Sequence, residues 1–382
     1  MNENSIYADI AKRTGGDIYI GVVGPVRTGK STFIRKFLDN LVLPNIENEY
    51  DRQRTEDEIP QSASGKTVMT TEPKFVPDES VKIKTPDGTE LNVKMVDCVG
   101  YMVGGALGGE EDGESRMVMT PWSEEEMPFA KAAEIGTEKV IREHSTIAIL
   151  VTTDGSIAGI ERESYLPAEE RIVAELEASG KPFAIILNSK NPGTEEATTL
   201  AHSLEEKYSA PVALVSCPDL NKDDIREILS LILGEFPLRS MTFDLPEWCA
   251  ALPKDHPLMQ ENLEMISAFS QRVEKFGDVN RELSAFPELS LEKMNAADGT
   301  AGFTVPQKPA AFFETLSEMT GMTLTDQRSL FDTVCELAKM REKYLRVEEA
   351  LRNVEEKGYG IVMPDASEMK FDEPKLVRQR AI

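Results

Sequence analysis

The segment Gly24–Ser31 constrains the fold most, because its sequence GPVRTGKS matches the phosphate-loop pattern G-x-x-x-x-G-K-[ST]. An apolar, strand-like run at Ile18–Val23 precedes it, and a helical pattern begins near Ser31, so both required flanks are present. Gly24 and Gly29 let the backbone curl around a phosphate, Lys30 can bridge the β- and γ-phosphates, and Ser31 can bind Mg²⁺. The other loop residues predicted to bind nucleotide are Pro25, Val26, Arg27, Thr28 and Thr32.

A second motif, Asp97-Cys98-Val99-Gly100, follows another apolar run and has the form D-x-x-G. In this form the carboxylate of Asp97 holds Mg²⁺ through water, and the amide of Gly100 reaches the γ-phosphate. Thr70 and Thr71 lie upstream in a polar loop, and a predicted hairpin of Val81–Thr85 and Glu90–Val96 follows them. This order is typical of switch-type GTPases, and it predicts that one of the two threonines, Thr71 in our assignment, completes the Mg²⁺ shell while both serve catalysis. The alternative is two ordinary loop threonines.

The base-recognition segment departs from the guanine-specific pattern N-K-x-D. Asn188-Ser189-Lys190-Asn191 stands at that position, after the apolar run Phe183–Leu187. The carboxylate that would reject adenine is missing, so ATP becomes at least as good a candidate as GTP. We expect Asn188 and Ser189 to contact the nucleotide.

The sequence also predicts slow hydrolysis. Tyr101 follows the D-x-x-G motif where related enzymes place a glutamine that orients water. Arg27 occupies a phosphate-loop position at which its guanidinium could supply positive charge during hydrolysis. A surface salt bridge for Arg27 is an equally open interpretation.

Hydrophobic periodicity changes near residue 240. Residues 1–240 alternate strand and helix patterns, which predicts an α/β P-loop NTPase domain of the translation-factor-like (TRAFAC) class with a mainly parallel sheet. Residues 241–382 predict a helix-rich α+β domain with a long helix at about 326–357, capped by Thr325 and ended by Gly358. That helix either packs on its own domain or forms an intermolecular coiled coil. Tyr101–Phe129, rich in glycine and acid, predicts a long mobile loop.

Charge and composition exclude several other classes. The chain has 42 Lys and Arg against 67 Asp and Glu, a net charge of −25, so we expect no nucleic-acid partner. Its 4 cysteines form no C-x-x-C pair, which argues against a zinc site. No run approaches the ~20 apolar residues that span a membrane, and the N-terminus lacks a signal-peptide pattern, so a cytoplasmic protein is expected.

Several stretches closely resemble one family, stage IV sporulation protein A. The resemblance is dense over the first 240 residues and thinner beyond. The matching stretches are Arg13–Gly24, Val26–Phe33, Thr70–Pro77, Val96–Tyr101, Glu134–Thr137, Glu143–Thr146, Lys357–Ile361 and Asp372–Pro374.

The resemblance implies a morphogenetic ATPase of endospore-forming bacteria that uses ATP with Mg²⁺. By resemblance, hydrolysis drives a conformational change and irreversible self-polymerisation into the basement layer of the spore coat, in the mother-cell cytoplasm at the outer forespore membrane. Lys30 matches the family's phosphate-loop lysine, Asp97 its Mg²⁺-linked aspartate, and Thr70 and Thr71 its sensor threonines. Loss of N-K-x-D agrees with a family that uses ATP.

The family continues past the position matching Arg380 into a further C-terminal domain. By resemblance, that domain engages a small amphipathic membrane-anchoring peptide and recruits coat proteins. We expect that domain to be absent from this chain, and both partners are assigned to it. Two other functions stay open: a switch GTPase in ribosome or RNA biology, and a scaffold with a structural nucleotide site.

Overall fold

The computed structural model describes residues 6–59, 73–84, 90–104, 106, 110–111, 114–121, 123–364 and 369–370. Compactness divides the chain into two units. The first combines Met1–Leu245 with Ala251–Val305, and the second combines Pro246–Ala250 with Pro306–Ile382. The boundary predicted at residue 240 was drawn from sequence patterns and stays a prediction.

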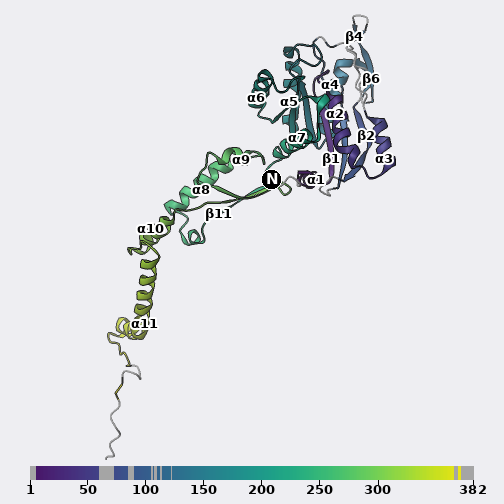
Figure 1. Cartoon of the computed structure of the whole chain (residues 1–382). Coiled ribbons are helices and arrows are strands. Elements are labelled where there is room, and N and C mark those ends of the chain that lie inside the picture. Colours follow the sequence, from purple (N-terminus) through teal and green to yellow (C-terminus); the bar gives the residue numbers. More distant parts are fainter. Residues whose placement is uncertain are drawn as a thin grey trace, which may run out of the picture. The chain divides into compact units, whose positions relative to one another are not determined.

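A six-stranded sheet in the order β10-β9-β8-β1-β3-β2 forms the centre of the first unit (Figure 1). All neighbours are parallel except β2, which pairs antiparallel with β3 at the edge, as the predicted hairpin requires. The strands are β1 Asp17–Val23, β2 Lys74–Lys84, β3 Glu90–Asp97, β8 Ile147–Thr153, β9 Phe183–Asn188 and β10 Val212–Val215. The predicted α/β architecture of the N-terminal region is therefore confirmed.

Helices cover both faces of this sheet, because successive strand residues alternate between two cores. Ile147 and Ile149 of β8 lie in one core with residues of α1, α2 and α7, whereas Ala148 and Leu150 lie in the other with residues of α5 and α6. The helices are α1 Ile6–Thr14, α2 Lys30–Phe37, α3 Glu49–Glu58, α4 Phe129–Lys139, α5 Leu166–Ser179, α6 Glu195–Tyr208 and α7 Lys222–Gly234. Short π or 3-10 turns are η1 Leu38–Val42, η2 Leu43–Asn45, η3 Val140–His144, η4 Arg162–Ser164 and η5 Cys217–Asp219.

The prediction of one long loop over Tyr101–Phe129 is wrong for much of its length. Two antiparallel pairs lie within it, β4 Glu110–Glu111 with β5 Glu114–Ser115, and β6 Met117–Thr120 with β7 Ser123–Pro128. The amide of Phe129 donates to the carbonyl of Arg116 (2.7 Å), which anchors the second pair to the start of α4. Glycine and acid content pointed to a loop, but the run Met117–Thr120 finds a strand partner that composition does not reveal.

A smaller sheet, β11-β13-β12, completes the first unit with two helices. Its core is aromatic: the rings of Phe243, Phe269 and Phe303 have centroids 5.0 to 6.2 Å apart. The elements are β11 Ser240–Asp244, α8 Pro257–Ser270, α9 Asp278–Leu283, β12 Ser290–Asn295 and β13 Thr300–Thr304.

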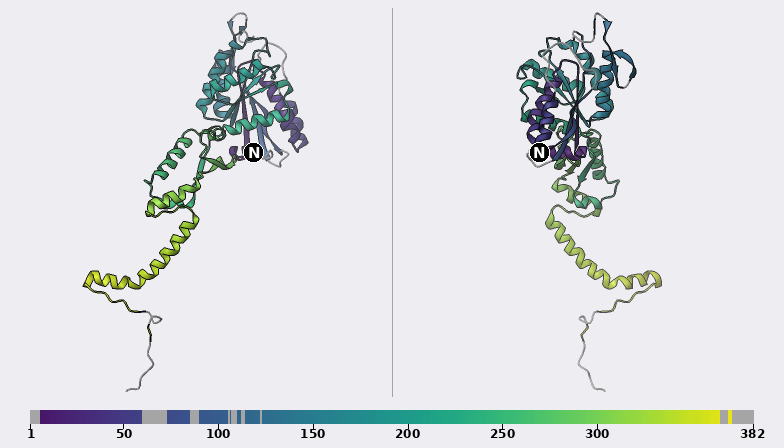
Figure 2. Two further views of the ribbon diagram at one scale, coloured as in Figure 1. Left: turned by 60° about the vertical axis from the view of Figure 1, so that its left-hand side comes forward. Right: turned by 90° about the vertical axis from the view of Figure 1, so that its right-hand side faces the viewer.

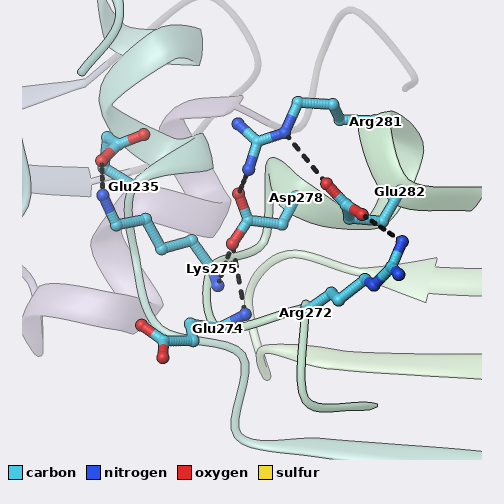
Figure 3. Close-up of polar contacts among 7 residues, drawn as sticks. All are labelled: Glu235, Arg272, Glu274, Lys275, Asp278, Arg281 and Glu282. Atoms are coloured by element: carbon cyan, nitrogen blue, oxygen red, sulfur yellow. Dashed lines mark hydrogen bonds and ion pairs between the residues drawn. The ribbon is translucent and has the colours of Figure 1, made fainter. Parts of the chain in front are cut away.

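A polar cluster joins the end of α7 to the turn that precedes α9 (Figure 3). Lys275 pairs with Glu235 at 2.5 Å, and Oδ2 of Asp278 accepts hydrogen bonds from the amides of Glu274 (3.2 Å) and Lys275 (2.8 Å). The other oxygen of Asp278 accepts from Arg281 at 2.6 Å. Because Asp278 is buried, these contacts fix the turn against α7.

The second unit contains α10 Pro309–Thr320 and α11 Gln327–Lys357 (Figure 2). It also contains the 3-10 segment η6 Glu247–Ala251 except for its last residue. The expected cap at Thr325 is wrong. The side chain of Asp326 instead accepts from the amide of Ser329 (2.8 Å), and the hydroxyl of Ser329 accepts from the amide of Asp326 (3.1 Å), which forms a capping box. Gly358 ends the helix in the left-handed conformation, as predicted. No helix in the described part of the chain is long and apolar enough to cross a membrane.

Candidate nucleotide site

The predicted phosphate loop leaves the carboxyl end of β1 and enters α2, as its motif requires. Gly24 and Gly29 take φ of 150° and 99°. A Cβ on Gly24 would lie 2.2 Å from the carbonyl oxygen of Val151 on β8, so no other residue fits there. Lys30 is the first residue of α2, which places the helix N-terminus and its dipole at the loop.

Lys30 is buried and bonded to the loop itself. Its ammonium donates to the carbonyls of Pro25 (2.7 Å) and Gly24 (3.2 Å). Burial lowers the pKa of Lys30, while the charge of Asp97 opposes that shift. The hydroxyl of Thr28 also donates to the carbonyl of Pro25 (3.0 Å), so two side chains brace the loop. The ammonium is thus held where a bound phosphate would meet it.

The hydroxyl of Ser31 and the carboxylate of Asp97 meet at the ends of α2 and β3. Ser31 Oγ donates to Asp97 Oδ2 at 2.8 Å, whereas Oδ1 of Asp97 is buried without a hydrogen-bond partner. Burial raises the pKa of Asp97, and the charge of Lys30 opposes that shift. A hydroxyl and a carboxylate oxygen with unused capacity fit Mg²⁺, which usually takes one or two protein oxygens and fills its shell with water and phosphate. The described residues contain no larger cluster of His, Cys, Asp and Glu that could hold a metal.

The D-x-x-G segment lies directly against the phosphate loop. A Cβ on Gly100, whose φ is 88°, would come within 2.0 Å of the Gly24 carbonyl oxygen and 2.6 Å of Lys30 Nζ. The amide of Val26 donates to the carbonyl of Tyr101 (2.9 Å). The two motifs are therefore in direct backbone contact. A displacement of Gly100 would change its contacts with Gly24 and Lys30 in the phosphate loop. Thr70 and Thr71, the predicted sensor residues, lie outside the described residues.

Asn188 links the phosphate loop to the loop after β10. Its Nδ2 donates to the carbonyl of Thr28 (2.9 Å), and its Oδ1 accepts from the amide of Cys217 (3.0 Å). Ser189 is also buried, and its hydroxyl accepts from the amide of Asn191 (3.1 Å). The predicted pair thus lies beside the phosphate loop, although both polar ends of Asn188 are used within the protein.

Sequence reasoning missed Asp154, which follows β8 in the segment Thr153–Ser156. Its carboxylate accepts from the amide (2.9 Å) and hydroxyl (2.5 Å) of Ser156 and bonds to the Ser189 side chain. Burial favours the neutral acid, but these hydrogen bonds outweigh it and hold the pKa of Asp154 below its ordinary value. The Asp-Gly-Ser turn at the end of an apolar strand was the signal available in the sequence.

Arg27 adopts φ of 67°, a left-handed conformation that costs a non-glycine residue about 1 kcal/mol or more. It makes no ion pair with any described residue, and its Nε and Nη2 are buried without a hydrogen-bond partner. Among the described residues the structure therefore does not support the surface salt bridge. Burial raises the pKa of Tyr165, and the charges of Arg27 and Arg162 oppose that shift, so both guanidiniums act on a hydroxyl that also lacks a partner.

The three histidines lie apart and take local roles. His144 packs edge-on against Phe75 with centroids 5.3 Å apart, His202 lies 3.3 Å from Glu205, and His256 caps α8 by accepting from the amide of Leu258. None of these contacts involves the phosphate loop.

Comparison with protein families covers nearly the whole chain. The family described as "Stage IV sporulation protein A, ATPase domain" matches residues 1–237, and the one described as "Stage IV sporulation protein A, middle domain" matches residues 238–381. The first match contains every described residue of the candidate site.

Individual relatives agree with the family match. Stage IV sporulation protein A of Clostridioides difficile (strain 630) is 46% identical over 98% of this chain and 78% of its own length. The proteins of that name from Bacillus subtilis (strain 168) and Bacillus anthracis are 42% and 44% identical, each over 99% of this chain and 78% of the relative. The chain therefore belongs to the stage IV sporulation protein A family and is a sporulation protein with an ATPase domain.

Proposed function

We propose that this chain hydrolyses ATP with Mg²⁺ and that hydrolysis drives its polymerisation into the basement layer of the spore coat. The observation that carries the enzymatic part is the carboxylate of Asp97, which holds Ser31 with one oxygen and buries the other without a partner beside Lys30. That arrangement fits a metal and a phosphate better than it fits a closed structural core.

We assign the ATPase domain to the translation-factor-like class of P-loop NTPases. The antiparallel edge strand β2, placed directly before the strand that ends in Asp97, supports this assignment. In such a site Ser31 and Asp97 hold Mg²⁺, with Thr71 as a further ligand, and Thr70 and Thr71 sense the γ-phosphate. When bound, Mg²⁺ neutralises charge on the phosphates and orients them for attack by water.

The protein's own groups supply the rest. The backbone N–H groups of residues 27–32 surround the phosphates, Lys30 bridges the β- and γ-oxygens, and the amide of Gly100 contacts the γ-phosphate. Arg27 provides positive charge toward the transferring phosphoryl group, which would give its two buried, unpartnered nitrogens acceptors. Because Tyr101 cannot orient water as glutamine does, turnover is slow.

ATP rather than GTP is the proposed substrate. No carboxylate occupies the last position of the segment Asn188–Asn191, where a guanine-specific site would accept two hydrogen bonds from the base. The amide of Asn188 is already bonded to Thr28 and Cys217, so it stiffens the site rather than reading the base.

The wider role follows from family membership and is likewise proposed. The chain assembles with copies of itself in the mother-cell cytoplasm, at the outer forespore membrane. Contact with a small amphipathic membrane-anchoring peptide and with other coat proteins is assigned to the further C-terminal domain of the family. Loss of Gly100 contacts on phosphate release would free the D-x-x-G segment from the loop and change the shape of the ATPase domain.

One experiment tests both parts of the proposal. Turnover of ATP and of GTP is measured together with light scattering for the unaltered chain, Lys30→Ala, Asp97→Ala and the control Lys36→Ala on the same helix. We expect ATP-specific turnover that chelation of Mg²⁺ abolishes, a loss on the order of 10²-fold or more in the two site variants, and no change in the control. Scattering should rise only when ATP is hydrolysed.

Other outcomes point elsewhere. A preference for GTP would support a switch GTPase, and assembly without turnover in the unaltered chain would support a scaffold with a structural nucleotide. Arg27→Ala is measured in the same assay with and without K⁺, because a bound K⁺ could supply the same positive charge as the Arg27 guanidinium. Unchanged turnover in both conditions would remove Arg27 from the mechanism.

A further inference from the structure

The long helix α11 carries a row of apolar side chains that no described residue of its own unit covers. Of its 31 residues only Ala350 is buried. Leu337, Met340, Tyr344, Leu351 and Val354 are each 44 to 54 % exposed. Most helical stability in proteins comes from packing an apolar face, so a helix of this length with an open face lacks a partner within the described part of its own unit.

The open face has the spacing of a coiled-coil stripe. Reading Leu330 as position a of a heptad places an apolar residue at seven of the eight a and d positions over four heptads, with Thr333 as the exception. We call these residues the α11 stripe. Its a positions are Leu330, Leu337, Tyr344 and Leu351, and its d positions are Thr333, Met340, Val347 and Val354.

The charged residues beside the α11 stripe favour one relative orientation of two paired α11 helices. In a parallel, in-register pair each g position faces the e position of the next heptad on the other helix. This places Glu336 opposite Arg341, and Lys343 opposite Glu348, so both pairs are attractive. An antiparallel pair that keeps all layers would instead bring each Arg341 against the second copy's Arg341 and each Lys343 against its Lys343, which is repulsive.

We propose that α11 pairs with α11 of a second copy of this chain as a parallel, in-register coiled coil through the α11 stripe. The periodicity explains why these apolar residues remain exposed in a single chain, and the charge pattern explains why the partner is a copy in the same orientation. The proposal rests on the proposed assembly function and names one contact within it, which forms without nucleotide.

Cysteine cross-linking tests the pairing in the full chain without ATP. The chain offers its own control, because Cys335 is exposed at an outward f position, while Cys98, Cys217 and Cys249 are buried. In a Cys335→Ser background, Leu337→Cys and Leu351→Cys should each give disulfide-linked dimers under mild oxidation. Leu345→Cys, at an outward b position, should not, and neither should native Cys335.

Cross-linking from both Leu337→Cys and Leu351→Cys requires a parallel pair, because in the antiparallel pair position 337 faces position 347. The proposal would be overturned if neither Leu337→Cys nor Leu351→Cys formed disulfide-linked dimers. It would also be overturned if Leu345→Cys formed as large a fraction of dimers as they do. Monomers in which the stripe is protected from thiol reagents would show that the chain itself covers α11, which would also overturn it.

A matched pair of substitutions gives an independent measurement. Leu337→Ser with Leu351→Ser should weaken dimerisation at least tenfold in sedimentation, whereas Leu345→Ser should not change it. Glu336→Lys with Glu348→Lys should weaken it severalfold, and adding Arg341→Glu with Lys343→Glu should restore it. Circular dichroism checks that each variant keeps its helix content, and restoration by charge exchange excludes simple misfolding.

The same variants separate this inference from the proposed function. Lys30→Ala should lose turnover and nucleotide-driven scattering but keep the cross-link at Leu337→Cys. The Leu337→Ser and Leu351→Ser variant should lose dimers but keep its rate of ATP turnover. A Lys30→Ala chain that no longer cross-links would overturn the nucleotide-independent pairing while leaving the ATPase assignment intact.

Discussion

The hydroxyl of Tyr101 donates a 2.5 Å hydrogen bond to the carboxylate of Glu175 on α5. The ring is buried, and the guanidinium of Arg171 lies 4.7 Å from its centroid. Burial raises the pKa of Tyr101 strongly, and the bond to Glu175 adds to that shift, so the hydroxyl stays protonated at physiological pH. Tyr101, the residue after the D-x-x-G motif, is thus hydrogen-bonded to α5 and does not orient a water molecule.

Tyr101→Phe should leave ATP turnover within about twofold of the unaltered chain, because it keeps the buried ring and removes only the hydroxyl. It should lower the free energy of unfolding by about 1 to 2 kcal/mol, since Glu175 loses its donor. Turnover and chemical denaturation measure the two effects. A large fall in turnover with unchanged affinity for ATP would show that the hydroxyl takes part in catalysis.

Asn188→Ala should weaken nucleotide binding about tenfold, which corresponds to about 1.4 kcal/mol. The substitution removes the donor to Thr28 and the acceptor from Cys217, so the phosphate loop loses its link to the loop after β10. Titration with a fluorescent ATP analogue measures the affinity. Asn191→Ala, an exposed neighbour, is the control, and equal losses in both variants would contradict a special role for Asn188.

Sequence patterns predicted the elements whose signals are local. The strand, loop and helix around Gly24–Ser31, the antiparallel edge hairpin and the parallel strands were all found from periodicity and turn residues. The bounds of α11 differ from the predicted 326–357 by one residue, since apolar spacing and the end signal at Gly358 fix them.

What escaped prediction depends on contacts between distant residues. The hairpin of β6 and β7 exists because Met117–Thr120 pairs with a segment too acidic to be read as a strand. Asp154 enters the site only because β8 and β9 end side by side, which brings it to Ser189. The α11 cap moved from Thr325 to Asp326 because both residue types cap well and only the backbone geometry chooses between them.

Glu169→Ala should lower the free energy of unfolding by about 3 to 5 kcal/mol, because it removes one partner of a buried ion pair. The carboxylate is fully buried and accepts from Arg162 (2.7 Å), Tyr208 (2.9 Å) and Thr152. Its loss would leave the Arg162 guanidinium without its counter-charge.

The adjacent Glu170 provides the control for this prediction. It pairs with Lys207 at 2.5 Å in an exposed position, so Glu170→Ala should change stability by less than about 1 kcal/mol. Urea unfolding followed by circular dichroism compares the two. Similar values would mean that the buried network around Glu169 contributes little.

Cys335 should be the only thiol that reacts quickly with Ellman's reagent in the folded chain at pH 8. It is exposed, whereas burial raises the pKa of Cys217 to about 12. Since the thiolate is the reactive form, roughly one Cys217 in 10⁴ would be reactive at that pH. Stopped-flow titration should count one fast thiol, which Cys335→Ser removes, and four after denaturation. More than one fast thiol would show that a buried cysteine is accessible in the folded chain.

Asp278→Ala should loosen the junction between α7 and the smaller sheet without unfolding the ATPase site. The carboxylate accepts hydrogen bonds from two backbone amides of the turn and from Arg281. The same turn carries two backbone hydrogen bonds to the segment after α7, from Phe276 to Phe236 (3.0 Å) and from Leu238 to Glu274 (2.9 Å). We expect a loss of about 2 to 3 kcal/mol in local stability, because a buried acceptor of three bonds disappears.

Hydrogen exchange in the Asp278→Ala variant should therefore quicken 30-fold or more at the amides of Leu238 and Phe276, while those of β9 stay protected. Glu282→Ala, which removes a partly buried partner of Arg272 and Arg281 but no bond to Asp278, should leave both sets unchanged. Faster exchange across β9 in the Asp278 variant would mean that the two sheets unfold as one unit, and the junction would then transmit any change from the nucleotide site directly to residues 238–305.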